Sequence, residues 1–161
     1  ARSFQIPQPF SGMTVLENAL VSATQGANIS IGNAENHCID ILELTGLLRK
    51  ANTLAGELTL LERKRLELAK ALATKPKILL LDEIAGGLTE QECQVLIKVI
   101  LNIMRENISI IWIEHVVHAL LSVVQRLLVL DFGTKVADGN PSEIMKSKTV
   151  QKIYLGIDAD G

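Results

Sequence analysis

The chain has 161 residues, enough for one sizeable hydrophobic core. Hydrophobic residues make up 48% of the chain and aromatic residues only 3%, so aliphatic side chains dominate, as in buried parallel strands and the helices packed on them. The net charge of −2 gives no sign of a nucleic-acid partner, and no apolar run reaches the roughly 18 residues of a membrane span. Cys38 and Cys93 lack metal-ligand spacing, which favours reduced, buried thiols.

The first half of the chain is expected to be nearly all helical. Thr14 and Glu17 form a Thr-x-x-Glu capping box before a helix that continues to about Ala23. A loop rich in glycine, asparagine and serine separates this helix from a second one over 33–45, and a third helix is expected over 62–73. These elements predict a helical lobe attached to a sheet core.

The second half alternates strands and helices. The expected elements lie at 78–81, 89–106, 108–113, 116–124 and 127–130, followed by a short strand near Val136 and a terminal helix from Pro141. Such alternation implies right-handed crossovers and a mostly parallel sheet. The predicted fold class is therefore α/β, with a partial, mostly parallel sheet, flanking helices and an α-helical subdomain.

The apolar run 78–81 ends abruptly in two carboxylates, Asp82 and Glu83. They fall at the carboxyl end of the expected strand, where open α/β sheets bind ligands. Burying two adjacent carboxylates is costly unless a cation or ligand compensates, and a Mg²⁺–nucleotide site provides that compensation. In such a site the first acid holds the metal and the second orients and polarises a water molecule. An ordinary strand-to-loop exit is the alternative interpretation of this segment taken alone.

His115 directly follows the second buried strand. If the strands over 78–81 and 108–113 are neighbours, His115 and Glu83 face the same crevice. A histidine there can donate a hydrogen bond to a phosphate oxygen. The simpler alternative is a histidine that caps the next helix.

Together these segments resemble the ATP-binding subunit of ABC transporters, most closely the branched-chain amino acid uptake type. The matching segments in chain order are the Q-loop pair Phe4-Gln5, the stretch 9–18 after it, the signature region 58–73, the Walker B strand with its acids at 78–83, the D-loop 85–89, the switch histidine His115 and the tail 150–156. The resemblance covers nearly the whole chain and implies a P-loop NTPase-like fold.

The resemblance assigns a role to each matching polar residue. Asp82 would hold Mg²⁺, directly or through water, and Glu83 would act as the general base or orient the attacking water. His115 would contact the γ-phosphate. Gln5 would sense the nucleotide and bind the metal, and its loop would meet the membrane subunit. The implied cofactors are ATP and Mg²⁺.

The signature region departs from the family pattern Leu-Ser-Gly-Gly-Gln, because 58–62 reads Leu-Thr-Leu-Leu-Glu. Thr59 keeps a hydroxyl group, but Leu61 replaces a glycine that allows close approach and positive φ. Glu62 places an anion near the expected phosphate, which is unfavourable unless its side chain points away. Thr59 and Leu61 would face the ATP of the partner subunit, and we expect this clamp to be altered.

The phosphate-binding motif Gly-x-x-x-x-Gly-Lys-Ser/Thr does not occur in the sequence. In the family it precedes the Q-loop, so we expect the chain to be the C-terminal portion of a longer protein and to bind ATP weakly or not at all by itself. The expected segments are 1–74 with the Q-loop, helical subdomain and signature helix, 75–140 with the sheet core, and 141–161 as a helical extension.

The function implied is that of an ATP-hydrolysing importer subunit for branched-chain amino acids, bound peripherally at the cytoplasmic face of the membrane. Its implied partners are transmembrane permease subunits, a second ATP-binding subunit arranged head to tail and, indirectly, a periplasmic or extracellular solute-binding protein. A DNA-repair ATPase of the same superfamily needs a long coiled-coil insertion, for which 5–58 leaves no room. The alternative function is a non-catalytic binding or regulatory module. The coding sequence upstream of Ala1 would distinguish this module from an ATP-hydrolysing subunit, because the latter needs a phosphate-binding motif there.

Overall fold

The computed structural model describes residues 1–3 and 5–155. The chain divides into two compact units, Ala1–Ala119 and Leu120–Gly161. Phe4 of the expected Q-loop pair and the end of the expected tail, from Gly156, lie outside the described residues. The three segments expected from the sequence follow motif order rather than packing, and that division stays a prediction.

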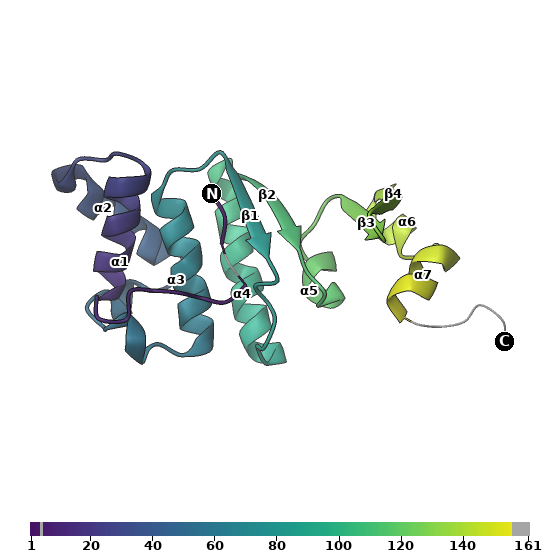
Figure 1. Ribbon diagram of the computed structural model, residues 1–161, viewed down its shortest axis with the longest axis horizontal. Coiled ribbons are helices and arrows are strands. Elements are labelled where there is room, and N and C mark those ends of the chain that lie inside the picture. Colours follow the sequence, from purple (N-terminus) through teal and green to yellow (C-terminus); the bar gives the residue numbers. More distant parts are fainter. Residues whose placement is uncertain (4, 156–161) are drawn as a thin grey trace. The chain divides into compact units, whose positions relative to one another are not determined.

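Three mutually packed helices form the helical lobe of the first unit (Figure 1). They are α1 (Val15–Val21), α2 (Ile31–Leu44) and α3 (Leu60–Ala73). α1 begins at the expected capping box, in which the Glu17 N–H donates to Thr14 Oγ1 at 3.2 Å and the Thr14 N–H donates to Glu17 Oε2 at 2.7 Å. The lobe has an aliphatic core that includes Val15, Ala19, Leu42, Leu66 and Leu68.

Short irregular helical turns connect these helices. They are a short π-helix over Ser22–Gly26 after α1 and two 3₁₀ turns, Leu48–Lys50 and Ala55–Glu57, between α2 and α3. Cys38 and Cys93 are free and buried, as expected. Burial raises the pKa of Cys38 to about 11, so this thiol stays protonated at neutral pH.

The sheet of the first unit contains β1 (Ile78–Asp82) and β2 (Ser109–Ile113), which run parallel in the register Ile78↔Ser109 to Asp82↔Ile113. They are joined through α4 (Glu90–Ile103), which starts at the expected Thr89 capping box, and a 3₁₀ turn at Met104–Glu106 (Figure 1). Because the strands are parallel and end together, the residues after Asp82 and after Ile113 leave the sheet at one edge. The candidate site lies at this edge, where β1 and β2 end.

The second unit contains an antiparallel hairpin, β3 (Leu127–Asp131) with β4 (Thr134–Gly139), followed by α6 (Pro141–Ile144) and α7 (Lys148–Leu155). The short helix α5 (Val117–Leu121) spans the boundary between the units.

The expectation that the strand over 127–130 continues a parallel sheet is wrong, because β3 pairs with β4 in a sheet of its own. The connecting residues Phe132 and Gly133 both have positive φ, 43° and 78°. Such a two-residue turn favours hairpin pairing with the next strand, which closes a much shorter loop than a crossover does.

Candidate functional site

Asp82 ends β1 and points a carboxylate toward the beginning of the chain. Its Oδ2 accepts a hydrogen bond of 2.7 Å from the Arg2 guanidinium. Residues 1–3 lie along β1, where Ser3 N–H donates to the Leu80 carbonyl at 2.9 Å. The Asp82 side chain is 31% exposed, so a solvated cation can reach it.

Glu83 is the centre of a polar cluster at the edge where both strands end. Its N–H donates to the Ile113 carbonyl at 2.9 Å, and its backbone is left-handed with φ of 44°. Its carboxylate Oε2 accepts a hydrogen bond from the side-chain amide of Gln5 and lies 3.6 Å from His115 Nδ1. The structure thus brings together three predicted site residues, Gln5, Glu83 and His115, with Asp82 adjacent in the chain.

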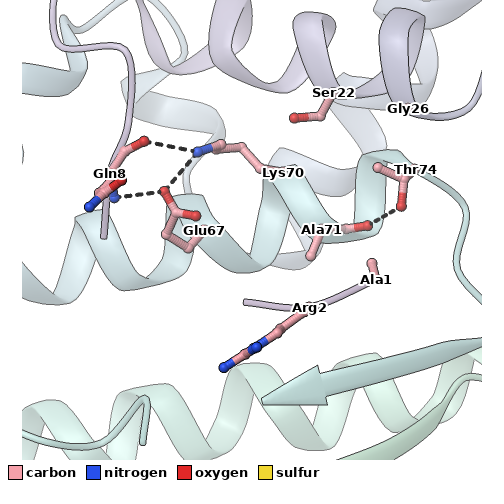
Figure 2. A pocket seen from close by; sticks show the side chains of 9 residues that line it. All are labelled: Ala1, Arg2, Gln8, Ser22, Gly26, Glu67, Lys70, Ala71 and Thr74. Atoms are coloured by element: carbon pink, nitrogen blue, oxygen red, sulfur yellow. Dashed lines mark hydrogen bonds and ion pairs between the residues drawn. The ribbon is translucent and has the colours of Figure 1, made fainter. Parts of the chain in front are cut away.

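A second hydrogen-bond network fixes the chain segment that follows Gln5. The Gln8 N–H donates to Glu67 Oε1 at 3.2 Å, and Lys70 Nζ donates to the Gln8 carbonyl at 3.2 Å and to Glu67 Oε1 at 2.8 Å, as Figure 2 shows. Glu67 and Lys70 belong to α3, so the segment after Gln5 is tied to the helix of the signature region. The adjoining hollow of about 480 Å³ contains none of the predicted site residues.

Thr59 and Leu61 stand apart from this cluster. Thr59 is the N-cap of α3 and forms a capping box with Glu62, and Leu61 lies in the first turn of that helix without positive φ. Within the described part of the chain, no hydrogen bond or ion pair joins Thr59 or Leu61 to Glu83 or His115. Leu61 replaces a glycine of the family pattern, and glycine would permit a positive φ. Because φ is not positive at Leu61, the leucine introduces no backbone strain.

The Glu62 carboxylate forms an ion pair with Lys50. Lys50 Nζ lies 2.9 Å from Glu62 Oε1, and the Thr59 N–H donates to Glu62 Oε2 at 3.0 Å. Burial alone would raise the pKa of Glu62, but Lys50 and the Thr59 N–H outweigh it, so the pKa is lowered and the carboxylate is ionised at neutral pH. The negative charge of Glu62 is therefore balanced by Lys50.

Sequence reasoning missed two features of this region. The Thr59-x-x-Glu62 box follows the same pattern as the one found at Thr14 and could have been read from the sequence. Glu114 was passed over although it stands between a buried strand and a candidate site residue. Its side chain is completely buried. An acidic residue directly after a buried strand could have indicated this role from the sequence, because a buried carboxylate needs hydrogen-bond partners.

Two carboxylates, an amide and a histidine at the carboxyl edge of parallel strands are the features of an ATPase site in a P-loop NTPase-like α/β domain. The match to the family model described as "ABC transporter", over residues 1–86, agrees with this class. The chain belongs to the ABC transporter family, as a member of its ATP-binding, ATP-hydrolysing subunits.

Individual relatives are similar over most of the chain. The protein is 34% identical to the "High-affinity branched-chain amino acid transport ATP-binding protein LivG" of Escherichia coli and 32% identical to BraF of Pseudomonas aeruginosa, in each case over 96% of this chain and 67% of the relative. A solved ATP-binding cassette of an ABC transporter in its ADP conformation superposes with a TM-score of 0.82 at 28% identity, covering 98% of this chain and 68% of that one. The expected family and fold class are confirmed.

Among residues 1–3 and 5–155, no helix is both long and apolar enough to cross a membrane.

Proposed function

We propose that this chain supplies the catalytic carboxylate and switch histidine of an ATP-hydrolysing subunit that powers uptake of branched-chain amino acids. The observation that carries the proposal is the contact of Glu83 with both Gln5 and His115 at the edge where β1 and β2 end. The substrate class is supported by the similarity to LivG and BraF, both named as branched-chain amino acid transport proteins.

Asp82 is the proposed Mg²⁺ ligand, with Gln5 as a second one. Mg²⁺ is held in nucleotide sites by one or two protein oxygens together with phosphates and water. No group of three or more acidic, histidine or cysteine ligands occurs among the described residues. The Gln5 amide uses Nε2 toward Glu83, so its oxygen can face a cation. Arg2 pairs with Asp82 Oδ2, and we propose that the ion takes the place of this guanidinium.

Glu83 and His115 are the proposed catalytic residues. A carboxylate held by an amide and an imidazole has a fixed direction, which suits it to orient and polarise an attacking water. His115 is 62% exposed, so its imidazole can reach a γ-phosphate oxygen. When bound at Asp82 and Gln5, Mg²⁺ would supply positive charge to neutralise the charge that develops on the phosphates.

The proposed partners follow from the family. The subunit binds transmembrane permease subunits at the cytoplasmic face of the membrane as a peripheral protein, and it acts indirectly on a periplasmic or extracellular solute-binding protein. It pairs head to tail with a second ATP-binding subunit, so that Thr59 and Leu61 face the ATP of that subunit. The N-terminus of α3, capped by Thr59, supports this arrangement because it provides backbone N–H groups for an anion.

A chimera tests the proposal. The N-terminal segment of LivG, which in this family carries the phosphate loop, is placed before residue 1, and ATPase activity is measured with and without Mg²⁺. We expect Mg²⁺-dependent hydrolysis that falls by at least about a hundredfold in Glu83→Gln, since the amide cannot accept a proton from water. Glu43→Gln, an exposed carboxylate on α2, is the matched control and should leave turnover unchanged.

Two results would overturn these roles. Hydrolysis that is undiminished in Glu83→Gln would contradict the role of Glu83. A chimera that binds ATP but does not hydrolyse it would favour the alternative of a non-catalytic module.

A further inference from the structure

Glu114 is a buried acid between β2 and His115, and the proposed chemistry does not use it. Its side chain has no solvent exposure. An ionised carboxylate in such a place is costly unless hydrogen bonds and charge compensate it. The groups that provide this compensation therefore indicate what the residue does.

The two carboxylate oxygens bind two different parts of the site. Oε2 accepts hydrogen bonds from the Ala85 N–H at 2.9 Å and from Trp112 Nε1 at 3.2 Å. Oε1 accepts from the N–H groups of His115, at 3.0 Å, and Val116, at 3.3 Å. One oxygen therefore binds the loop that leaves β1, and the other binds the turn that leaves β2.

These links bear directly on the two proposed catalytic residues. Ala85 is two residues after Glu83, and His115 is itself one of the donors. Both loops are thus fixed to one rigid group, while Glu83 Oε2 lies 3.6 Å from His115 Nδ1. A carboxylate shared in this way adds to the Glu83 N–H bond with the Ile113 carbonyl and holds the two loops together beyond the ends of the strands.

The network also extends to the helix of the signature region. Lys64 on α3 is buried, and burial lowers its pKa, a shift that the charge of Glu114 opposes. Glu114 therefore has a charge interaction with α3 in addition to its hydrogen bonds to both loops.

We propose that Glu114 is a positioning residue that holds Glu83 and His115 in contact, an inference that rests on the proposed ATP hydrolysis at those two side chains. A carboxylate is required because it offers two acceptor oxygens, one for each loop. A glutamine has one acceptor oxygen and an NH₂ group that would face another N–H donor. The change Glu114→Gln therefore releases one of the two loops without altering side-chain size.

The test uses the chain itself and NMR of the His115 ring. In the unmodified chain, Glu83→Gln changes the His115 Cε1–H chemical shift because the two groups are in contact. In the Glu114→Gln background we expect that change to fall by at least about half, the coupling expected of a double-mutant cycle between linked residues. Trp112→Phe is the matched control, since it removes one donor to Glu114 but keeps the backbone links, and it should preserve the change.

Amide hydrogen exchange gives a second readout in the same chain. Glu114→Gln should speed exchange of Ala85, or of His115 and Val116, by about tenfold. The Glu83 N–H, which donates to the Ile113 carbonyl, should keep its protection. The positioning role would be overturned if Glu83→Gln changed the His115 shift as much in the Glu114→Gln background as in the unmodified chain. It would also be overturned if Trp112→Phe reduced that change as much as Glu114→Gln does.

In the chimera, Glu114→Gln should lower kcat by about tenfold or more and leave the KM for ATP within about twofold, because the Glu114 side chain is completely buried and acts through the residues that it holds. The role would also be overturned if Glu114→Gln left kcat normal although it reduced the effect of Glu83→Gln on the His115 chemical shift. If the unmodified chimera has no ATPase activity, the proposed function fails, while the shift and exchange measurements still decide whether Glu114 holds the two loops.

Discussion

Glu83 combines a strained backbone with the proposed catalytic role. Its φ of 44° lies in the left-handed region, which costs a non-glycine residue roughly 1 kcal/mol or more. We predict that Glu83→Gly raises the free energy of unfolding by about 0.5–1 kcal/mol, because glycine adopts this conformation without a Cβ clash. The same change removes the carboxylate and should abolish hydrolysis in the chimera. Denaturant unfolding and ATPase assays measure the two effects.

Lys75 provides the control for this prediction. It has φ of 51°, follows the end of α3 and is exposed. Lys75→Gly should raise stability by a similar amount and leave turnover unaltered. Glu83→Gly also removes the hydrogen bond from the Gln5 amide. If both Glu83→Gly and Lys75→Gly destabilise the chain, the left-handed backbone is not a source of strain at these positions.

The sequence located the site residues by different routes. The position of Asp82 and Glu83 at a strand end followed from an apolar run that stops at two acids, and hydrophobic patterning can predict that. The pairing of Gln5 with Glu83 joins residues 78 positions apart, and only the family resemblance placed them together. Glu114 escaped notice because its role depends on four N–H groups that converge only after folding.

The start of α3 carries a pH-dependent contribution to stability. Glu62 has a pKa below its ordinary value of 4.5 in the folded chain, and its ion pair with Lys50 exists only while the carboxylate is charged. A lowered folded-state pKa stabilises the fold above the unfolded pKa, and this contribution is lost as the pH falls through the folded value. We predict that Glu62→Gln costs about 0.5 kcal/mol at neutral pH and that this cost decreases steadily as the pH is lowered from 7 into the acid range. Urea unfolding across this range measures the difference.

Salt and a second substitution separate the ion pair from the cap. Glutamine can still accept from the Thr59 N–H, so the capping box survives in Glu62→Gln. In the Lys50→Gln background the cost of Glu62→Gln should disappear, and high salt should reduce it in the unmodified chain. A cost that does not decrease with falling pH, or that is unchanged without Lys50, would show that the ion pair is not its source.

Helices were more predictable than strand pairing in this chain. The boxes at Thr14 and Thr89 place helix starts through contacts within four residues, and α1 and α4 begin there. Strand pairing depends on partners that the local sequence does not name. The turn at Phe132 and Gly133 pairs β3 with β4, and the positive φ at a phenylalanine gave the sequence analysis little warning, because this conformation usually selects asparagine or glycine.

At the scale of the whole molecule, the two faces of the β1–β2 sheet differ. Leu79 and Leu81 are buried on one face, while Ile111 and Ile113 on the other are 57% and 64% exposed. Ile78 and Leu80 share that exposed face, because side chains alternate along each strand. A contiguous apolar surface of this kind promotes association in water.

We predict that the chain expressed by itself associates increasingly as its concentration rises, through this exposed sheet face. The paired change Ile111→Thr with Ile113→Thr should reduce association and shift the free energy of unfolding by less than about 0.5 kcal/mol, since both side chains are already exposed and threonine suits a strand. Leu79→Thr is the contrast, because it places a hydroxyl group on the buried face and should cost about 2–4 kcal/mol. Sedimentation velocity over a concentration series measures association, and a double variant that associates as strongly as the original chain would assign the contact to another surface.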